Sequence, residues 1–599
     1  MTSSPSDQKW LIDPHQPNNY VTEFVREKTY VGIDFGTSST VVSIITVDDE
    51  GIWHPRTLEI KQEDGMGGYT EQSIINTILC WKNEQLLFGQ PAFKLKTKSK
   101  PGQNLFSSFK MDLGLDLGPT FPDSVLSRSK GAPYIIETAK DAAGYFFKLL
   151  FNGIYDSIKT NNLPTSIECA FSVPASFQDS QRKDLLEAIK FAGISIESSS
   201  FIDEPNAAFL SYFYESWKEE SGKTFIDALK KSPINILVYD FGAGTCDISI
   251  IKVGYKNGNL LSQNLAISRF TALGGDNIDK AIAEDILYDQ IQWTLNDEDF
   301  TIPFRLKNEI IIPRLMPIAE RLKISMIDWI IRQSIDSVYQ IKDQEHTVSD
   351  IESTIFKNER AKGFICPKIS IQEFKKIMLK FIDEDKEELN GSALLTDPIY
   401  DAIEKSHISL EDLFGVLFIG GSCENPFVRS SVMGIMPENV RSMIPFDLRA
   451  HVSQGAAIHC LGYHAFKYDF IQPVTSETIN IVTTGDNLAP LIKASTSVPS
   501  ETFEKIFIVP RENQKQIEIP ICLSSPDRIL DVLKIYSENT SPFIRGESLS
   551  ICGKINREKM LDVKVFMKGH EVSSSLIFPM SIEPISPLKE KYLKVLITL

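Results

Sequence analysis

The sequence predicts an α/β protein with two similar lobes, followed by a β-sandwich. Two stretches predict the lobes: VGIDFGTSST (Val31–Thr40) and NILVYDFGAGTCDISI (Asn235–Ile250). Each is an apolar strand that runs into an aspartate, a glycine turn and hydroxyl side chains. Self-similarity of this kind predicts a duplicated architecture. From Thr475 onward the pattern changes to the period-two alternation of antiparallel strands, which predicts the sandwich.

The composition is that of a globular protein with several domains. The chain has 599 residues, of which 42% are hydrophobic, 24% charged and 10% aromatic. Its net charge of -17 argues against broad binding to nucleic acid or anionic membranes, which depends on basic side chains. We therefore expect small-molecule and protein partners, with no nucleic acid and no membrane. The eight cysteines form no CxxC pair and are expected to be reduced structural thiols.

The N-terminal segment is polar. MTSSPSDQKWLIDPHQPNNY lacks the basic and apolar regions of a secretory signal, and no apolar run is long enough to span a membrane. We therefore expect a cytoplasmic location. Residues 1–28 are expected to form a flexible tail.

The two hairpins have the chemistry of a phosphate site. A tight turn needs positive φ at its tip, which glycine supplies, and successive backbone N–H groups there form an anion-binding concavity. The aspartates at the strand ends would repel phosphate unless a cation lay between them, and carboxylate with water is the ligand set that magnesium prefers. Two facing hairpins would clamp a nucleotide and its metal. The alternative is a pair of ordinary turns, in which Asp and Gly are common. Neither a P-loop nor a dinucleotide fingerprint is present.

Five further segments accompany the hairpins. They are the VPASFQDSQR, AG and EPNAA stretch within 170–212, TALGGDNIDKAI (271–282), RLMPIAERLKIS (314–325), LFIGGSCENP (417–426) and QGAAIH (454–459). With the paired hairpins they resemble the actin-like ATPase superfamily, a two-lobed duplicated fold of ribonuclease H type. DSQR is similar to the seventy-kilodalton heat-shock chaperone (DnaK-like) family in particular, and the similarity spans most of residues 29–463. The small residues of EPNAA and QGAA would let two helices cross tightly at a hinge.

The resemblance implies a role for each motif residue. The magnesium shell would be held by Asp34 and Asp240. The catalytic residues would be Lys110 at the γ-phosphate, Thr245 at the phosphates, and Glu204 and Asp247 on the water. The nucleotide would be bound by Gly36, Thr37, Ser38, Gly242, Gly244, Gly274, Gly275, Asp276, Glu320, Lys323, Gly420, Gly421 and Ser422.

Each of these residues has a plainer interpretation. Glu204 precedes a proline and fits a helix start, and a lone lysine such as Lys110 is usually a solvated surface group. Glu320 and Lys323, at i and i+3, fit a surface ion pair. The glycine pairs fit structural turns.

Three departures from the family pattern affect the expected chemistry. Ala243 replaces a glycine of the second phosphate loop, which predicts slower hydrolysis. Glu424 stands where the family has an arginine against the adenine, so that stacking contact is lost and nucleotide affinity or base preference is in doubt. ISIESSS (194–200) lacks the arginine near the family's J-domain docking surface, so a standard J-domain partner is not assumed.

Four regions are predicted. After the tail, residues 29–465 form the nucleotide-binding domain, 466–474 the interdomain linker and 475–599 a β-sandwich without a helical lid. Phe470 and Ile471 are expected either to dock on the ATPase domain or to begin a strand. IEIPICLS (517–524) and MLDVKVFMK (560–568) alternate as half-buried strands. Asn487–Phe507 is similar to the strand pair that opens the family's peptide-binding sandwich, and INREKMLDVKVFMKG (555–569) to a later pair. The terminal YLKVLITL also alternates, so the chain is expected to end within a strand.

The predicted function is that of an ATP-dependent chaperone. It would hydrolyse ATP to ADP and phosphate with Mg²⁺, and couple the nucleotide state to weak binding of extended peptides in protein folding and the stress response. Partners would be client polypeptides or a dedicated protein; the resemblance also implies J-domain or nucleotide-exchange co-chaperones, which the missing arginine leaves open. One alternative is a non-catalytic ATP-bound scaffold or exchange factor. A small-molecule kinase on the same fold is a weaker one.

Overall fold

The computed structural model describes most of residues 23–579. The gaps are 50, 116–117, 178, 197–199, 219–221, 257–258, 271–272, 297–300, 334–345, 383–392, 467–468, 476–477, 484–486, 495, 524–528, 538–541, 557–559, 568–569 and 572–575. The first 22 residues of the expected tail, part of ISIESSS and the terminal YLKVLITL lie outside the described residues. Residues at the end of the expected tail form α1 (Glu23–Arg26) and begin β1 (Lys28–Phe35).

The first large sheet contains the first hairpin. Its strand order is β11-β10-β1-β2-β3, with β6 beside β2. The strands are β1, β2 (Ser39–Val47), β3 (Trp53–Thr57), β6 (Ile74–Asn76), β10 (Ser166–Val173) and β11 (Phe201–Asp203). β1, β2 and β3 are antiparallel neighbours, whereas β10 and β11 run parallel to β1.

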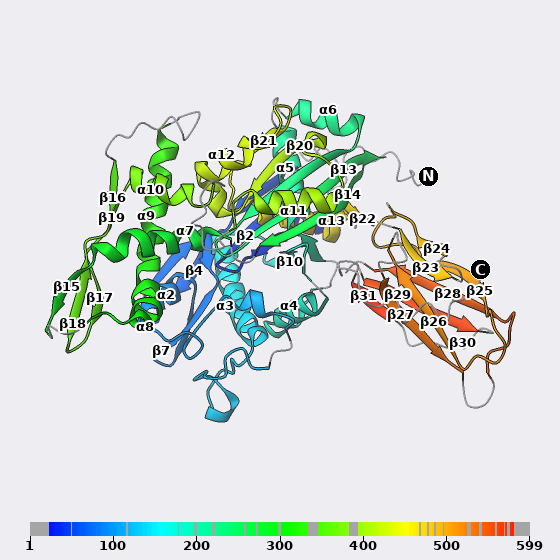
Figure 1. Cartoon of the computed structure of the whole chain (residues 1–599), viewed down its shortest axis with the longest axis horizontal. Coiled ribbons are helices and arrows are strands. Elements are labelled where there is room, and N and C mark those ends of the chain that lie inside the picture. The colour runs from blue at the N-terminus through cyan, green and yellow to red at the C-terminus, as the bar shows by residue number, and fades with distance from the viewer. Residues whose placement is uncertain are drawn as a thin grey trace.

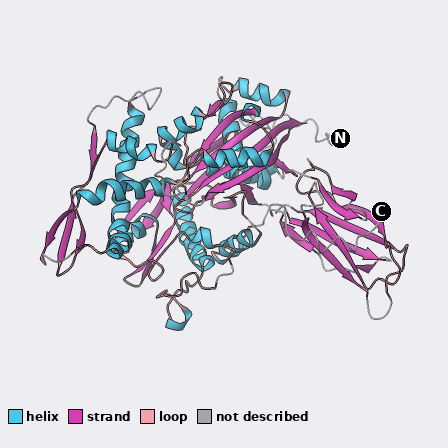
Figure 2. Ribbon diagram, in the orientation of Figure 1, coloured by secondary structure: helices cyan, strands magenta, loops and turns pink. Residues whose placement is uncertain are grey.

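The second large sheet contains the second hairpin and has the order β21-β20-β12-β13-β14-β22. The strands are β12 (Ile234–Phe241), β13 (Cys246–Lys256), β14 (Asn259–Phe270), β20 (Leu413–Ile419), β21 (Arg441–Met443) and β22 (Ile471–Val474). β12, β13 and β14 are antiparallel, and β20 and β21 are parallel additions on the β12 side. The two sheets therefore share one strand order, and β1 and β12 occupy equivalent positions (Figures 1 and 2).

Helices cover the outer faces of both sheets. The core of the first sheet includes α3 (Ala139–Thr160) and α4 (Asp179–Phe191). The core of the second includes α7 (Gly275–Ile282), α9 (Ile312–Arg332), α10 (Ile371–Leu379), α11 (Asp397–Ser406) and α12 (Pro426–Gly434). Shorter or peripheral helices are α2 (Gly89–Phe93), α6 (Lys223–Lys231) and α8 (Phe304–Leu306). Among the described residues, no helix has both the length and the apolar character needed to cross a membrane.

Two helices lie between the large sheets. α5 (Glu204–Lys218) and α13 (His451–Phe466) share one core with apolar residues of both sheets. The packing leaves no room for side chains: a Cβ on Gly455 would lie 1.8 Å from the carbonyl oxygen of Ala207, and one on Gly32 would lie 2.1 Å from the backbone nitrogen of Ala457. The close crossing of α5 and α13 that the small residues of EPNAA and QGAA predict is thus confirmed, whereas a hinge at this crossing stays a prediction.

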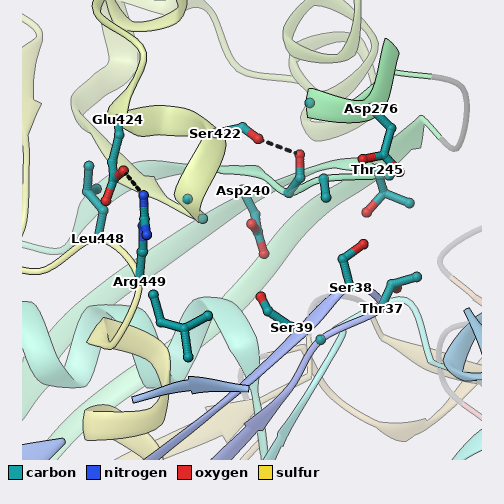
Figure 3. Close-up of a pocket in the computed structure, with 18 of the residues that line it drawn as sticks. Thr37, Ser38, Ser39, Asp240, Thr245, Asp276, Ser422, Glu424, Leu448 and Arg449 are labelled. Atoms are coloured by element: carbon teal, nitrogen blue, oxygen red, sulfur yellow. Dashed lines mark hydrogen bonds and ion pairs between the residues drawn. The ribbon is translucent and has the colours of Figure 1, made fainter. Parts of the chain in front are cut away.

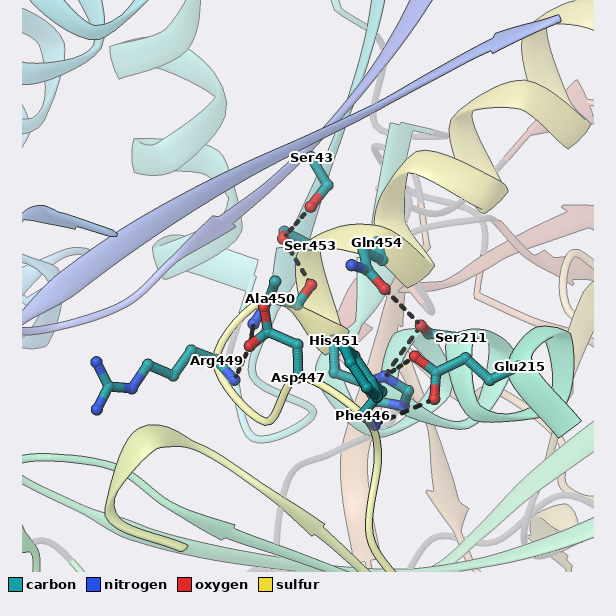
Figure 4. A network of polar contacts seen from close by, with 10 residues as sticks. All are labelled: Ser43, Ser211, Glu215, Phe446, Asp447, Arg449, Ala450, His451, Ser453 and Gln454. Carbon is teal, nitrogen blue, oxygen red and sulfur yellow. Dashed lines mark hydrogen bonds and ion pairs between the residues drawn. The ribbon is translucent and has the colours of Figure 1, made fainter. Parts of the chain in front are cut away.

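Buried hydrogen bonds tie the start of α13 to its neighbours (Figure 4). The hydroxyls of Ser453 and Ser43 are 2.7 Å apart, which links the helix to β2. On the other side, Ser211 Oγ of α5 lies 3.0 Å from Nδ1 of the fully buried His451. α13 is therefore held by polar contacts as well as by close packing.

Smaller sheets lie at the periphery. Next to the first large sheet, β4 (Ile60–Glu63) pairs with β5 (Tyr69–Gln72), and β7 (Ile78–Lys82) lies between β8 (Gln85–Phe88) and β9 (Leu105–Ser107). Farther along the chain, β18 (Ala361–Ile365) lies between β15 (Gln292–Leu295) and β17 (Ser353–Lys357), and β16 (Thr347–Ser349) pairs with β19 (Lys368–Ser370).

The C-terminal region is made of antiparallel strands, as the alternation predicts. One sheet has the order β24-β23-β26-β27 and the other β25-β28-β29-β30, with β31 beside β29. The strands are β23 (Ile479–Thr483), β24 (Asn487–Ile492), β25 (Phe503–Ile508), β26 (Gln516–Cys522), β27 (Ile529–Tyr536), β28 (Ser548–Ile555), β29 (Met560–Met567), β30 (His570–Glu571) and β31 (Leu576–Pro579). Apolar residues of both sheets form one shared core.

The strands within Asn487–Phe507 do not pair with each other. β24 pairs with β23, whereas β25 pairs with β28 in the other sheet. The loop between them therefore crosses from one sheet to the other rather than closing a hairpin. The later segment, residues 555–569, joins the end of β28 to β29, and these two strands are antiparallel neighbours.

The expected linker becomes part of the second sheet. β22 runs parallel to β14, from Leu260 opposite Ile471 to Gln263 opposite Val474. Phe470 and Ile471 are buried in the core between the sheets. Ile471 begins a strand, as one of the two expectations has it, and Phe470 packs into the same core; docking in one nucleotide state alone stays a prediction.

The tight crossing of α13 and α5 predicts that Gly455→Ala is destabilising. The added methyl would meet backbone, which cannot move aside as a side chain can, so we expect a loss of about 1–3 kcal/mol in unfolding free energy. Gly434, at the end of α12, provides the control: it has open space around its Cβ position, and Gly434→Ala should stabilise by about 0.5–1 kcal/mol. Thermal unfolding measures both. Equal melting temperatures would contradict the close packing.

Candidate functional site

The two hairpins open onto one cavity of about 280 Å³ (Figure 3). The predicted site residues that line it are Asp34, Gly36, Thr37, Ser38, Lys110, Glu204, Asp240, Gly242, Gly244, Thr245, Asp247, Gly275, Asp276, Glu320, Lys323, Gly420, Gly421 and Ser422. Gly274 is the one predicted residue outside this lining. Its Cβ position faces the carbonyl oxygen of Ala243 at 2.4 Å, so it allows loop packing instead.

The hairpin glycines have a different role from the one expected. None of Gly36, Gly242 and Gly244 adopts positive φ, so the prediction that the turns require it is wrong. Gly36 is needed for space, because a Cβ there would lie 2.2 Å from the carbonyl oxygen of Ser39. Gly244 has nothing within 4 Å of its Cβ position. Its backbone is therefore open to close approach by a ligand.

Asp34 lies near the end of β1. The parallel register places it opposite Ser172 of β10, whose hydroxyl donates a 2.8 Å hydrogen bond to Asp34 Oδ1. Burial, and then the negative charge of Glu204, raise the pKa of Asp34 to about 6, against the opposing effects of Lys110 and Ser172. The carboxyl is thus oriented by the neighbouring strand and only weakly acidic.

Asp240 occupies the equivalent place near the end of β12. Antiparallel pairing sets it opposite Asp247 of β13. Burial raises the pKa of Asp240 well above its ordinary value, and the nearby carboxylates of Glu204, Asp247 and Asp34 raise it further. The two strand ends thus bring several acidic groups into one place.

Lys110 and Glu204 form a buried ion pair beside these aspartates. Lys110 Nζ lies 3.1 Å from Glu204 Oε1, and the residues are only 6% and 8% exposed. A short 3₁₀ helix, Phe109–Asp112, carries the lysine, and Glu204 is the first residue of α5. The surface interpretation of Lys110 is therefore wrong. Glu204 starts a helix, as its plainer interpretation holds, but its side chain also enters the site.

The donor set fits a hydrated divalent cation. Asp34, Asp240, Glu204 and Asp247 supply four carboxyl groups beside the ammonium of Lys110, and the ammonium of Lys323, which also lines the cavity, is paired with Asp279, so the site has an excess of acidic groups. Within the described part of the chain, no three His, Cys, Asp or Glu side chains are close enough to hold an ion directly. Magnesium keeps several waters and binds through one or two carboxylates, so this arrangement suits it when water completes the shell.

Lys323 has another partner than the one suggested by its sequence spacing. Its Nζ lies 2.9 Å from Asp279 Oδ2 and donates to the carbonyl oxygen of Gly275 at 3.1 Å. Among the described residues, Lys323 forms its ion pair with Asp279 and not with Glu320, so the surface-pair interpretation is wrong. Lys323 instead joins α9 to α7, with its side chain buried.

The GGSCEN loop is locked onto the second hairpin. Ser422 Oγ donates a 2.9 Å hydrogen bond to the carbonyl oxygen of Gly242 (Figure 3). Gly420 has φ +83°, and a Cβ there would lie 2.6 Å from the carbonyl oxygen of Phe241. Here both the backbone conformation and the space require glycine.

Two of the predicted departures have visible consequences. Ala243 lines the cavity with ordinary backbone φ, and its carbonyl accepts a 2.7 Å hydrogen bond from the backbone N–H of Asp276. The alanine is thus accommodated without strain. Glu424 forms an ion pair with Arg449, which the sequence analysis did not consider.

Sequence reasoning missed three residues of this site, namely Ser172, Asp279 and Arg449. Ser172 lies in the quoted AFSVP segment and Asp279 in GGDNIDKAI, but neither stood out from its neighbours. A signal for Asp279 was present, since it follows Gly275 by one helical turn and lies between apolar residues of the same face. Arg449 had no signal of its own, because its partner is set by the fold.

The fold fits that of an actin-like ATPase: two sheets of one strand order are separated by two helices, and a hairpin of each sheet lines a shared cavity. The comparisons then give the family. The model of the Hsp70 protein family matches residues 160–535, and the chain belongs to this family.

Relatives in the same family are distant. A protein named "Chaperone protein DnaK" from Psychrobacter cryohalolentis is 25% identical over 505 residues, which cover 82% of this chain and 67% of the relative. Proteins of that name from Mycoplasma mobile and Mycoplasma mycoides are each 26% identical, over 82% of this chain and 68% and 69% of their own. The chain is thus a divergent member of the Hsp70 chaperone family.

The Asp279–Lys323 pair predicts a pH-dependent effect on stability. Burial raises the pKa of Asp279 from 3.8 to about 7, although Lys323 opposes the shift. The folded protein then holds this proton more tightly than the unfolded chain. The contribution of Asp279 to stability is complete below pH 3.8 and is lost as the pH rises through about 7.

Asp279→Asn removes this titration. We expect its unfolding free energy, relative to the wild type, to rise by about 1–2 kcal/mol between pH of about 5 and about 8. Thermal or urea unfolding across that range measures the difference. Asp328→Asn, at an exposed position of α9, controls for loss of an acidic side chain. A difference that stays constant or falls with pH would contradict the prediction.

Proposed function

We propose that this protein is an ATP-dependent chaperone that binds Mg·ATP between the two large sheets and hydrolyses it. The observation that carries the proposal is the buried Lys110–Glu204 pair, which lies beside Asp34 and Asp240 where both hairpins meet. A buried cation among several carboxyl groups, next to glycine loops with open backbone, is suited to a polyphosphate and its metal.

The residues of the cavity divide into groups with separate tasks. The hairpin loops, with Thr37, Ser38 and Thr245, would bind the β- and γ-phosphates through backbone N–H groups and hydroxyls. Lys110 would place a positive charge at the γ-phosphate, where charge develops during transfer. Asp34 and Asp240 would hold Mg²⁺, which when bound neutralises phosphate charge.

The water that attacks the phosphate would be positioned by carboxylates. Glu204 and Asp247 line the cavity beside Asp240, and a carboxylate within hydrogen-bond reach of a reacting water can orient it and accept its proton. Glu204 is itself oriented by its 3.1 Å contact with Lys110. Loss of either member of the pair would therefore disturb the other.

The architecture supports coupling between the site and the C-terminal region. We infer that the two large sheets are duplicated lobes, because their strand orders match, and that the C-terminal sheets are a β-sandwich, because they share one core. β22, which follows the ATPase region, is a strand of the second lobe. A change in lobe position would therefore be passed directly to the chain that leads into the sandwich.

The C-terminal strands offer apolar surface for an extended peptide. Ile506 and Ile508 are exposed on β25, an edge strand, and Tyr536 and Ile544 are also exposed. Exposed apolar side chains on a sheet edge suit β-strand addition by a partner segment. Client polypeptides are the partners proposed. The relatives' name, chaperone protein, agrees with this.

A non-catalytic scaffold is less well supported. Lys110, Glu204, Asp34, Asp240 and Thr245 all line the cavity, as hydrolysis requires.

Lys110→Ala tests the catalytic proposal. We expect the steady-state ATPase rate to fall about 10²–10³-fold, because a preorganised charge at the transferring phosphate is removed. Lys100→Ala, at an exposed lysine, is the matched control and should keep the wild-type rate. Wild-type turnover at buffer background, with and without an extended hydrophobic peptide, would instead support the scaffold. If the peptide leaves a measurable turnover unchanged, the coupling between nucleotide state and peptide binding is contradicted, but ATP hydrolysis is not.

Ala243→Gly tests the second hairpin. Removing the methyl lets backbone approach phosphate more closely, and we expect turnover to rise by a few fold, or about 1 kcal/mol of transition-state stabilisation. Ala243→Val should lower it. Single-turnover kinetics with bound ATP would separate this step from nucleotide release. If both variants keep the wild-type rate, residue 243 does not limit hydrolysis.

A further inference from the structure

The cavity has two chemically different ends, as Figure 3 shows. Thr37, Ser38 and Thr245 lie at one end, whereas Glu424 and Arg449 lie at the opposite one. The first end has the hydroxyls and open glycine backbone suited to phosphates. A nucleotide with its phosphates there would extend the remainder of the molecule toward Glu424 and Arg449.

The Arg449 side chain is held from two directions. Its guanidinium forms an ion pair with Glu424, the last residue of the short 3₁₀ helix Gly421–Glu424. Its stem lies over Gly421, with Cγ and Nε each 3.7 Å from the Cβ position of that glycine. Because Gly421 has no side chain, the arginine can lie flat against the loop. An arginine fixed in this way loses little conformational freedom on binding a ligand.

The same arginine keeps part of its surface open to the cavity. Its side chain is 37% exposed and lines the cavity, as does the side chain of the preceding residue, Leu448. α9 contributes Ile324 and Ile327 to the lining as well. This end therefore combines one planar cation with the apolar side chain of Leu448, and α9 adds the polar side chains of Glu320, Lys323 and Asp328 to the cavity lining.

A nucleotide base matches that combination. The π face of a base attracts a guanidinium, because guanidinium groups stack on aromatic rings. The remaining surface of the base can be covered by apolar side chains. Stacking of this kind tolerates different bases, because every base has a π face. It does not require a hydrogen-bond partner at the ring edge.

We propose that Arg449, held by Glu424, is the residue against which the nucleotide base lies. This deepens the proposed function and rests on it. The guanidinium comes from the segment before α13, and the carboxylate comes from the GGSCEN loop. Glu424 is then a positioning residue. It does not prevent base binding, because it orients the arginine on which the base lies.

Calorimetric titration of the full chain with Mg·ATP and with Mg·tripolyphosphate tests the proposal. Arg449→Ala should weaken ATP binding about tenfold, the size of a desolvated cation–π contact. Tripolyphosphate has no base, so its affinity should stay at the wild-type value. Arg321→Ala, which removes an exposed arginine paired with Asp350 outside the cavity, is the matched control and should change neither affinity.

The two ligands separate the possible failures. If ATP binding is unchanged in Arg449→Ala, the base does not lie on Arg449 and the inference is overturned, while ATP binding as such stands. If both ligands weaken equally, the residue acts on phosphates or on folding, and the inference is again overturned. If the wild type binds neither ligand, the proposed function itself fails.

A charge-swapped protein tests the positioning role of Glu424. Glu424→Gln leaves the guanidinium without its charged partner, and should weaken ATP by about threefold and tripolyphosphate not at all. The double variant Glu424→Arg/Arg449→Glu re-forms the pair with its members exchanged at the same end of the cavity. It should bind ATP more tightly than Arg449→Ala. A swapped protein with a wild-type melting temperature and no gain over Arg449→Ala would overturn the proposal.

Discussion

The close contact of α13 with β1 on one side and α5 on the other is the constraint on which the remaining structure depends. Gly32 and Gly455 leave no space for a side chain, so that backbone packs directly on backbone. Since α5 and α13 separate the two large sheets, this contact determines the distance between the end of β1 and the end of β12. The distance between the two hairpins, and hence the width of the cavity, follows from helix packing outside the cavity itself.

Bringing the two strand ends together also brings their charges together. Asp34 and Asp240 are shifted toward the protonated form, chiefly by removal from water and then by neighbouring carboxylates. Lys110 opposes both shifts and the Ser172 hydrogen bond opposes that of Asp34, but the ion-pair partner of Lys110 is Glu204. Buried charges of one sign are costly unless they are paired or bind a metal. The site is therefore electrostatically incomplete in the protein by itself, which is the physical reason for a bound cation in the function we propose.

Much of the site was predictable, because it is built from motifs that are local in sequence. The pattern of an apolar strand, an aspartate and a glycine turn predicts where Asp34 and Asp240 lie in their own hairpins. Partners were not predictable in the same way. The plainer interpretation of Lys323 paired it with Glu320, one turn away on α9, but it pairs with Asp279 on α7. The expected need for positive φ in the hairpins was also wrong, since close approach to backbone explains Gly36.

The sequence by itself determined the strand ends, the glycine loops, the residue types where the two hairpins line the cavity and the change to β-rich structure after Thr475. Only the tertiary structure decided which side chains meet. Sheet register sets Ser172 against Asp34, the packing of α7 on α9 sets Asp279 against Lys323, and the approach of α13 to the GGSCEN loop sets Arg449 against Glu424. Each pair joins segments far apart in the chain. Their meeting depends on how whole elements pack, which no local pattern of residues records.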